Sequence, residues 1–369
     1  ANAEEARSVE GMQVFSASSL RQAFAGILSY GSWPEYQPLN SLDREEQVEF
    51  LPVVPELELA DVRGQEKLVR GLQIAAAGGH NVLAFGPPGC GKTLAMEKFP
   101  GLLPLLTWQE AQSVTRIYSL TGLLPHNQPL VRERPFRMPH QSASLEGLVG
   151  GGYHCRPGEI SLAHNGVLFL DELPEFKKDT LDLMRQPLED GQVTISRISG
   201  SVTYPSEFML VCAMNPCKCG WYGDNTDRCT QFAVDNYRSR ISGPLLDRID
   251  IIIEMPSVKF EELQKREVAE SSECIKERVN LARKRQVFRY GEAGGMCNSR
   301  IGPNEIRRYC RLDEKSTELL RRAFIAFGLT ARSHDRILKV ARTIADLEGC
   351  EHIEYEHIAE AIQYRTVNI

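Results

Sequence analysis

The sequence contains no long hydrophobic run and no signal-peptide core. No uninterrupted apolar stretch approaches the roughly 18 residues that a membrane-spanning helix needs. The first ten residues are polar and acidic, unlike the apolar core of a secretory leader. These two absences predict a cytoplasmic protein with no membrane partner.

A strong charge of one sign is absent as well. Lysine and arginine number 43 against 49 aspartates and glutamates, which gives a net charge of −6. With 42% hydrophobic residues and so small a net charge, the chain is not intrinsically disordered. A net negative charge gives no long-range electrostatic attraction to nucleic acid, so nucleic-acid binding would need a local basic surface.

The ten cysteines are spread irregularly over 369 residues and do not form the dense framework of a secreted disulfide-rich domain. In a reducing compartment, cysteines pack in cores, react or bind metal. The chain is long enough for two or three domains with cores of their own.

Short apolar runs alternate with helical patterns between residues 65 and 254, as in an α/β protein with a parallel sheet. The predicted strands are residues 81–85, 167–170, 208–214 and 249–254, and a hairpin is predicted at residues 193–203. The predicted helices are residues 65–77 and 179–188, then 260–286, 303–310, 315–327, 333–347 and 355–364. The sequence therefore predicts an α/β core at residues 51–258 and a separate C-terminal helical domain at residues 259–369.

A glycine-rich octapeptide lies between a predicted strand and a predicted helix and fits the P-loop pattern GxxxxGK[ST]. Its residues are Gly86, Pro87, Pro88, Gly89, Cys90, Gly91, Lys92 and Thr93. In such a loop the backbone N–H groups surround the phosphates, Lys92 reaches the β and γ phosphates, and Thr93 holds Mg²⁺. A chance glycine-rich turn is the alternative, and the strand–loop–helix setting favours a site for ATP and magnesium.

Polar side chains end the next two predicted strands. Asp171 and Glu172 follow the first of them, where an open α/β sheet places its ligand groups. Asp171 is predicted to hold Mg²⁺ through water, and Glu172 to orient and deprotonate the attacking water. The alternative is a purely structural role, in which the pair is an acidic helix cap. Asn215 ends the second strand and is predicted to orient the same water, although a lone Asn there is usually a turn residue.

An ATPase of this kind needs arginines that neutralise the charge developing on the γ-phosphate. Arg248, just before the last predicted strand, is the predicted arginine finger that a neighbouring subunit would supply. Arg240 is the second candidate for this role. Arg332, at the start of a predicted lid helix, is a candidate for a γ-phosphate contact. Taken singly, each arginine is more often a surface or salt-bridge residue.

Longer segments of the chain resemble AAA+ ATPases of the magnesium-chelatase-like group, and within them the ComM/YifB family. These segments are residues 75–81, 134–137, 150–152, 156–164, 166–176, 242–250 and 341–347. The resemblance runs from about Val9 over nearly the whole chain. One departure is Pro139-His140-Gln141, where the family usually has two histidines after the proline.

The resemblance implies an AAA+ core with a helix-2 insert at about residues 142–159 and a pre-sensor hairpin at residues 193–203. Both would face the central pore of a homo-hexamer, beside a helical lid from residue 259 onward. Residues 1–50 would be the last part of a Lon-like domain with its linker. ComM-like proteins resemble hexameric DNA helicases that drive branch migration in natural transformation. Arg197 is then the basic candidate for a DNA phosphate contact, with a solvated hairpin arginine as the alternative.

The family also has a four-cysteine loop, of which this chain keeps Cys217, Cys219 and Cys229 and has Gln231 at the fourth position. Thiolates select zinc, and a closed structural site takes four ligands. The three cysteines therefore either hold zinc with a fourth ligand from elsewhere or remain reduced free thiols. Cys90 and Cys212 are predicted to have packing roles.

Three functions share this ATPase site. The first is an ATP-driven DNA translocase, the second a protein-remodelling or chelatase-type motor, and the third a scaffold that hydrolyses ATP slowly. Aromatic pore loops favour polypeptide and basic hairpins favour phosphate. The segment at residues 195–203 contains Arg197 and no aromatic residue, which favours DNA.

Overall fold

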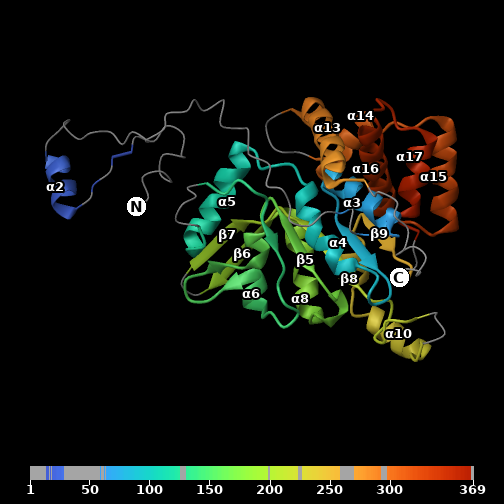
Figure 1. Cartoon of the computed structure of the whole chain (residues 1–369), viewed down its shortest axis with the longest axis horizontal. Helices are drawn as coiled ribbons and strands as arrows, with labels where there is room; N and C mark the ends of the chain where they lie inside the picture. The colour runs from blue at the N-terminus through green and yellow to red at the C-terminus, as the bar shows by residue number, and fades with distance from the viewer. Residues whose placement is uncertain are drawn as a thin grey trace. The chain divides into compact units, whose positions relative to one another are not determined.

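The computed structural model describes residues 19–28, 64–124, 130–197, 200–222, 227–257, 270–291 and 297–366, with Val14, Phe15, Ala17, Leu59 and Val62. The chain divides into two compact units. The small unit comprises residues 1–54 and 105–133, and the large unit comprises residues 55–104 and 134–369. The elements of both units are labelled in Figure 1.

The small unit contributes two described helices. Helix α2 (Leu20–Leu28) falls in the predicted Lon-like remnant, most of which lies outside the described residues. Helix α5 (Trp108–Thr121) begins with a capping box, in which the Thr107 side chain accepts from the Glu110 N–H and the Glu110 carboxylate accepts from the Thr107 N–H. Its buried face packs against Leu130.

The large unit is built on a five-stranded sheet of order β2-β5-β8-β1-β9, in which every adjacent pair is parallel. The strands are β1 (Val82–Phe85), β2 (Phe136–Arg137), β5 (Val167–Leu170), β8 (Met209–Met214) and β9 (Ile251–Glu254). All residues of β1, β5 and β8 are buried, as expected for central parallel strands with both faces covered. The predicted α/β fold with a parallel sheet is confirmed.

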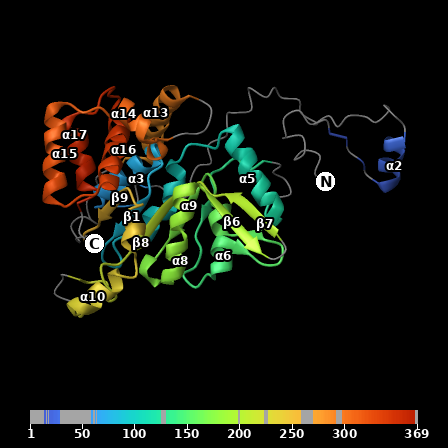
Figure 2. The ribbon, with the colours of Figure 1, turned by 180° about the vertical axis from the view of Figure 1, so that it is seen from behind.

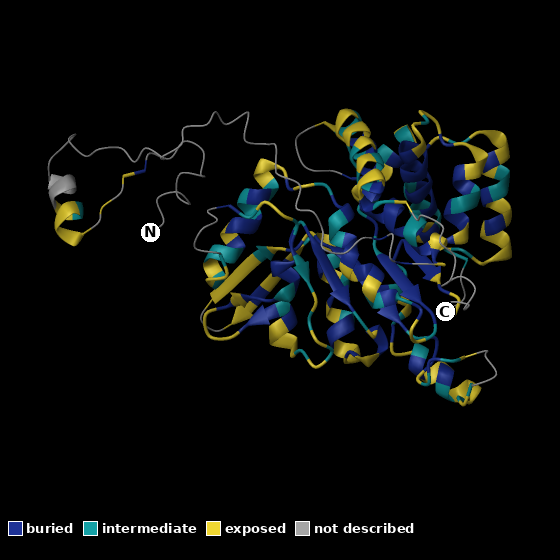
Figure 3. Cartoon of the chain, in the orientation of Figure 1, coloured by how far each residue is buried: buried dark blue, intermediate teal, exposed yellow. Residues whose placement is uncertain are grey.

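Two separate hydrophobic cores lie on the two faces of this sheet. Successive side chains of a strand point to opposite faces, so Val82 and Ala84 join one core and Leu83 and Phe85 join the other. The first core also contains helix α3 (Glu66–Gly78) and the lid, and the second contains the buried side of the hairpin. Figure 3 shows the central strands as buried and the outer helix faces as exposed.

The remaining short elements of the large unit connect these layers. They are α4 (Lys92–Lys98), η3 (Phe99–Leu102), α7 (Glu159–Leu162), η4 (Leu173–Glu175), α8 (Lys178–Leu183), α9 (Arg185–Asp190), α10 (Gln231–Arg238), α11 (Gly243–Leu246) and η5 (Asn298–Arg300).

The predicted insert and hairpin pack against each other. The insert forms helix α6 (Leu145–Val149) and the short strands β3 (Gly150–Gly151) and β4 (Arg156–Pro157). The hairpin forms from β6 (Gln192–Arg197) and β7 (Gly200–Pro205), with residues 198–199 outside the described chain. A Cβ at Gly150, whose φ is 106°, would lie 2.6 Å from Ile195 Cδ1, so glycine permits this close approach. The hairpin and α6 are visible from behind in Figure 2.

The last four helices of the C-terminal region lie close to their predicted positions. The first, predicted at residues 260–286, begins at Ser272 in the described chain, and residues 260–269 lie outside the described residues. The helices of this region are α13 (Ser272–Tyr290), α14 (Pro303–Tyr309), α15 (Glu314–Ala326), α16 (Ala331–Glu348) and α17 (Tyr355–Gln363). Side-chain caps at Ser271, Asp313 and Thr330 start α13, α15 and α16. Helices α13 and α16 pack on α3 and so attach the lid to one face of the sheet. Among the described residues, no helix is both long and apolar enough to cross a membrane.

Candidate nucleotide-binding site

Three predicted motifs meet at the edge where the parallel strands end, which we call the carboxyl edge. The P-loop follows β1, Asn215 follows β8, and the Asp171-Glu172 pair follows β5. These strands are neighbours in the order β5-β8-β1, so the segments that follow them lie side by side. The Gly86 N–H donates to the Met214 carbonyl at 3.3 Å and joins the P-loop to the end of β8.

Glycine is required in the P-loop for two different reasons. Gly89 and Gly91 have φ of 78° and 88°, a region that side chains with a Cβ rarely adopt. A Cβ at either position would meet no atom within 4 Å, so the space beside this backbone is open. A Cβ at Gly86 would instead lie 2.5 Å from the Met255 carbonyl oxygen, so the chain passes too closely there for another residue.

The Lys92 ammonium lies against the backbone of the P-loop. The side chain is buried, and Nζ donates to the carbonyl oxygens of Gly86 at 2.7 Å and Pro87 at 2.8 Å. Cys90 is also buried, and its Sγ lies 3.6 Å from Lys92 Nζ. The loop thus holds a cation where the phosphates of a nucleotide would need one.

The two predicted magnesium-binding side chains are in direct contact. Thr93 Oγ1 donates to Asp171 Oδ2 at 2.9 Å, although 78 positions separate the residues in the sequence. Asp171 Oδ1 accepts from the Glu172 N–H at 2.9 Å, which fixes the carboxylate plane. Hard oxygen ligands of this kind suit Mg²⁺, so the residues present fit that ion.

Glu172 has an unusual backbone conformation. Its φ of 50° and ψ of 49° lie in the left-handed region, which costs a residue other than glycine about 1 kcal/mol or more. The Glu172 side chain is exposed, so it is accessible to a ligand at the carboxyl edge. Strain of this kind often accompanies a side chain that is held in place for catalysis.

Tyr237, on α10, is a neighbour of this site that the sequence did not reveal. Burial, together with the carboxylates of Glu175 and Glu172, raises the pKa of Tyr237 to about 12. The Asn215 backbone acts on the same hydroxyl through a hydrogen bond. Tyr237 is buried in the second core, and in the sequence it resembles an ordinary core position of an amphipathic helix.

The three candidate arginines lie at two different edges. Arg240 Nη1 donates to the Pro174 carbonyl at 3.1 Å and pairs with Glu175 at 3.3 Å, beside the loop that follows Glu172. Arg248 instead precedes β9, and Asn81, which precedes β1, donates to the Arg248 carbonyl at 2.9 Å. Arg248 thus lies at the amino edge of the sheet, separated from the carboxyl edge by the length of β1, about 13 Å.

Arg332 lies beside Arg248 at this amino edge. Both line a pocket of about 360 Å³ together with Arg336 and other polar residues. Arg336, one turn after Arg332 on α16, pairs with Asp250 and donates to the Arg248 carbonyl at 3.2 Å. Arg248 itself pairs with Glu189 and is 11% exposed. The pocket contains no P-loop residue, so neither Arg248 nor Arg332 shares the site of Lys92 within one chain.

The predicted zinc-binding cysteines form a cluster with a carboxylate. Ligand atoms of Cys217, Cys219, Cys229 and Asp227 all lie within 4.8 Å of one another. Asp227 Oδ1 accepts from the Cys229 N–H at 2.9 Å and lies 3.6 Å from Cys219 Sγ. Asp227 is thus a fourth candidate ligand that the sequence did not reveal, and three thiolates with one carboxylate suit zinc.

Two further details distinguish this cluster. The backbone N–H groups of Arg228 and Trp221, with the Cys217 thiol, lower the pKa of Cys219, while the hydrogen bond with Cys219 raises the pKa of Cys229 to about 11. Gln231 does not join the cluster, because its amide bonds Tyr222 and Asp235 instead. Cys212, by contrast, is an isolated core residue of β8 whose thiol pKa is raised by burial.

Comparisons with known proteins agree with this architecture. Residues 58–263 match the family model described as "Magnesium chelatase, subunit ChlI", and residues 269–365 match the model of its C-terminal part. The chain is 46% identical to the YifB protein of Escherichia coli over 89% of its length. It is 42% identical to the competence protein ComM of Haemophilus influenzae over 99% of its length, or 70% of that protein.

The chain spans 64% of the length of the Escherichia coli YifB protein and 61% of that of Salmonella typhimurium. It is also 25% identical, over 42% of its length, to the magnesium-chelatase 38 kDa subunit of Cereibacter sphaeroides. The two family models and the identity to ComM agree with the parallel sheet, its P-loop and the helical lid. This chain therefore belongs to the magnesium chelatase ChlI family of AAA+ proteins and, within it, to the ComM/YifB group.

Proposed function

We propose that this chain is the ATP-hydrolysing part of a hexameric motor that acts on DNA. The observation that carries the ATPase is the meeting of the P-loop, the Thr93–Asp171 pair and Glu172 at one edge of the sheet. Membership of the AAA+ family supports the same activity.

Each side chain has a role in this proposal. The P-loop N–H groups and Lys92 bind the phosphates, while Thr93 and Asp171 hold magnesium, which supplies positive charge to the β and γ oxygens. Glu172 accepts a proton from the attacking water, and the Asn215 amide orients that water. Most of the catalysis is then positioning and charge stabilisation, as in other phosphoryl transfers.

We place Arg248 and Arg332 at the nucleotide of a neighbouring subunit. Both lie at the amino edge, away from the P-loop of their own chain, and a cation there has no γ-phosphate to neutralise within one subunit. In a ring, this edge of one copy could face the carboxyl edge of the next. Hydrolysis would then require assembly, as the resemblance to hexameric helicases implies.

The DNA substrate is supported by the hairpin and by one relative. In the hairpin, Arg197 is 44% exposed. A relative with 42% identity is a competence protein, which supports a role in natural transformation. With the resemblance to helicases of the ComM type, we propose that this role is branch migration of DNA.

The test is ATPase activity of the full-length parent with and without forked DNA, together with unwinding of the fork. Stimulation and unwinding are expected.

A protein-remodelling or chelatase-type motor is the second candidate, and one observation favours it. Tyr153, between β3 and β4, is 82% exposed and stacks edge to face on His154. The family resemblance implies that the insert faces the pore, where an exposed aromatic side chain could grip polypeptide. Absence of DNA stimulation, with stimulation by an unfolded protein that Tyr153→Ala abolishes, would establish this candidate instead.

We further propose that Cys217, Cys219, Asp227 and Cys229 hold a structural zinc ion. The cysteine loop packs on the P-loop, because a Cβ at Gly220 would lie 2.7 Å from Pro88 Cδ. Zinc would supply cross-links that fix this loop. The four residues would then support the shape of the nucleotide site without contacting nucleotide.

A further inference from the structure

We infer that a basic groove on the lid binds single-stranded DNA, at a place separate from the hairpin. The groove has a volume of about 860 Å³ and lies between α13, the end of α14 and the turn between α16 and α17. We call it the lid groove. This inference rests on the proposed action on DNA and adds a second contact surface to it.

One face of α13 forms a wall of the lid groove. Leu281, Lys284, Arg285, Phe288 and Arg289 all line it, and their spacing of three and four residues places them on one side of the helix. A hydrophobic residue on such a face normally packs inward. Phe288 is instead 94% exposed and Leu281 is 53% exposed, so the described chain leaves these two apolar side chains largely uncovered.

The lid groove carries a strong excess of positive charge. Its lining includes six cationic side chains: Lys284, Arg285, Arg289, Arg308, Arg311 and Arg342. Glu351 is its one lining carboxylate, and the buried Asp346 lies beneath it. Within the described chain no carboxylate pairs with Lys284, Arg308 or Arg311. A local excess of this size in a protein of net charge −6 indicates an anionic partner.

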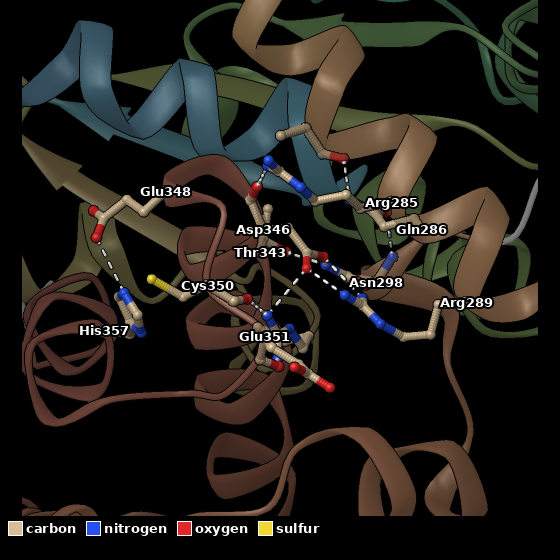
Figure 4. A network of polar contacts seen from close by, with 12 residues as sticks. Arg285, Gln286, Arg289, Asn298, Thr343, Asp346, Glu348, Cys350, Glu351 and His357 are labelled. Atoms are coloured by element: carbon tan, nitrogen blue, oxygen red, sulfur yellow. Dashed lines mark hydrogen bonds and ion pairs between the residues drawn. The ribbon is translucent and has the colours of Figure 1, made fainter.

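Polar contacts hold the arginines at the floor of the lid groove, and Figure 4 shows Arg285 and Arg289 beside Asp346. The Asp346 carboxylate accepts from Arg289 at 2.9 Å and forms an ion pair of 3.1 Å with Arg342, and the Asp346 backbone carbonyl accepts from Arg285. Arg342 also donates to the carbonyl oxygens of Glu351 at 2.7 Å and Cys350 at 2.6 Å. One carboxylate thus orients two guanidinium groups and cannot neutralise both.

The rim of the lid groove combines cations with aromatic rings. Tyr309 lines the lid groove but is half-buried, because Arg308 lies 5.0 Å from the centre of its ring and the Tyr290 ring packs edge to face against it. The exposed ring of the rim is therefore Phe288, on α13. Cations that follow a backbone beside exposed aromatic rings are the arrangement that binds unpaired strands, because bases stack on the rings while phosphates pair with the cations. An acidic peptide would use the cations but would leave Phe288 without a role.

The test measures binding of a fluorescent single-stranded oligonucleotide to the full chain as a function of salt. Lys284→Ala with Arg311→Ala should lower the salt slope by about 1.4, since each contact to a single strand contributes roughly 0.7. Phe288→Ala should weaken oligonucleotide binding roughly five- to a hundredfold. Phe288→Trp should bind the oligonucleotide as the parent does, because stacking needs only a flat ring.

Matched controls remove the same groups elsewhere on the lid. Arg322→Ala on α15 removes an exposed cation, and Phe327→Ala removes an exposed ring, and neither residue lines the lid groove. Both controls should bind as the parent does. All variants should keep parental ATPase activity without DNA and parental melting temperatures.

Three results would overturn the inference, and each points to a different conclusion. Unchanged oligonucleotide binding in the groove variants, while Arg197→Ala still reduces it, overturns the lid groove alone. A parent that binds no single-stranded DNA overturns the lid groove and the proposed DNA function together. The third result has two parts: poly-glutamate competes with the oligonucleotide as strongly as unlabelled single-stranded DNA does, and Phe288→Ala leaves oligonucleotide binding unchanged. That result would assign the lid groove to an acidic protein segment.

Discussion

Arg197 on the hairpin forms an ion pair of 2.7 Å with Glu146 on helix α6 of the insert. Both side chains are exposed, 44% for Arg197 and 62% for Glu146, so the pair is weak, of order 1 kcal/mol or less. A DNA phosphate could therefore displace Glu146 from Arg197 at little cost. The pair connects the two segments that the family resemblance places at the pore.

This relationship gives the first prediction. Glu146→Gln should tighten DNA binding up to about fivefold, because Arg197 no longer has a competing carboxylate. Arg197→Ala should lower the salt slope by about one unit and reduce fork unwinding, while basal ATPase activity remains. Binding isotherms and unwinding assays check both variants. If Arg197→Ala unwinds forks at the parental rate, this arginine does not contact the translocating strand.

The second prediction concerns zinc. Freshly purified protein, prepared without chelators, should contain close to one zinc ion per chain by elemental analysis. Cys219→Ser and Asp227→Ala should each lower this content, because they remove one of the four ligands. The control is Cys274→Ser, which changes an exposed cysteine on α13 and should leave the metal content unchanged. Protein free of metal would show that the cysteines are reduced thiols.

The third prediction concerns the arginines at the amino edge. Chains with Arg248→Ala or with Lys92→Ala should each be almost inactive, since an arginine supplied by a neighbour typically contributes about 10³ to 10⁵ in turnover. Mixtures of the two should regain activity, because some interfaces join an intact P-loop to an intact Arg248. Arg332→Ala should complement Lys92→Ala in the same way. Mixtures that co-assemble and stay inactive at every ratio would show that Arg248 does not act between subunits.

The fourth prediction concerns the pH dependence of stability. Burial lowers the pKa of His80, which bonds Thr343 at 2.8 Å and lies 3.4 Å from Asp250. The unfolded chain therefore binds a proton more readily than the folded one. The contribution of His80 is complete above its unfolded pKa of about 6.5, and the free energy of unfolding falls by up to about 1.4 kcal/mol per pH unit below it.

His80→Asn should reduce this dependence, whereas His352→Asn, at an exposed lid position, should keep it. Chemical denaturation at pH 7.5 and pH 5.5 measures the difference. An equal loss of stability in His80→Asn and in the parent would exclude His80 as its source.

Local patterns predicted the parts of the fold that depend on local chemistry. The P-loop, the strand β5 with its two carboxylates and the hairpin are specified by glycine positions, apolar runs and period-two alternation. The lid helices follow from apolar periodicity and side-chain caps, so α15, α16 and α17 agree with their predicted bounds to within about two residues.

Other features arise only when distant segments meet. Strand β2 has two residues, too few for any pattern, and it is a strand because Phe136 and Arg137 pair with β5. Arg332 and Arg248 come together because Arg336, on the same helix as Arg332, contacts Asp250 and the Arg248 carbonyl, and periodicity does not specify these contacts. Asp227 is one acidic loop residue among many until the backbone turns it toward the cysteines.

The central claim is that the carboxyl edge of the sheet hydrolyses ATP with Glu172 as the base. The most direct measurement is ATP binding and ATP hydrolysis by Glu172→Gln, beside Glu97→Gln on α4 as a matched control. The account predicts that Glu172→Gln binds ATP·Mg²⁺ as tightly as the parent and hydrolyses it at least about a hundredfold more slowly, while Glu97→Gln behaves as the parent. Hydrolysis by Glu172→Gln at the parental rate would contradict it.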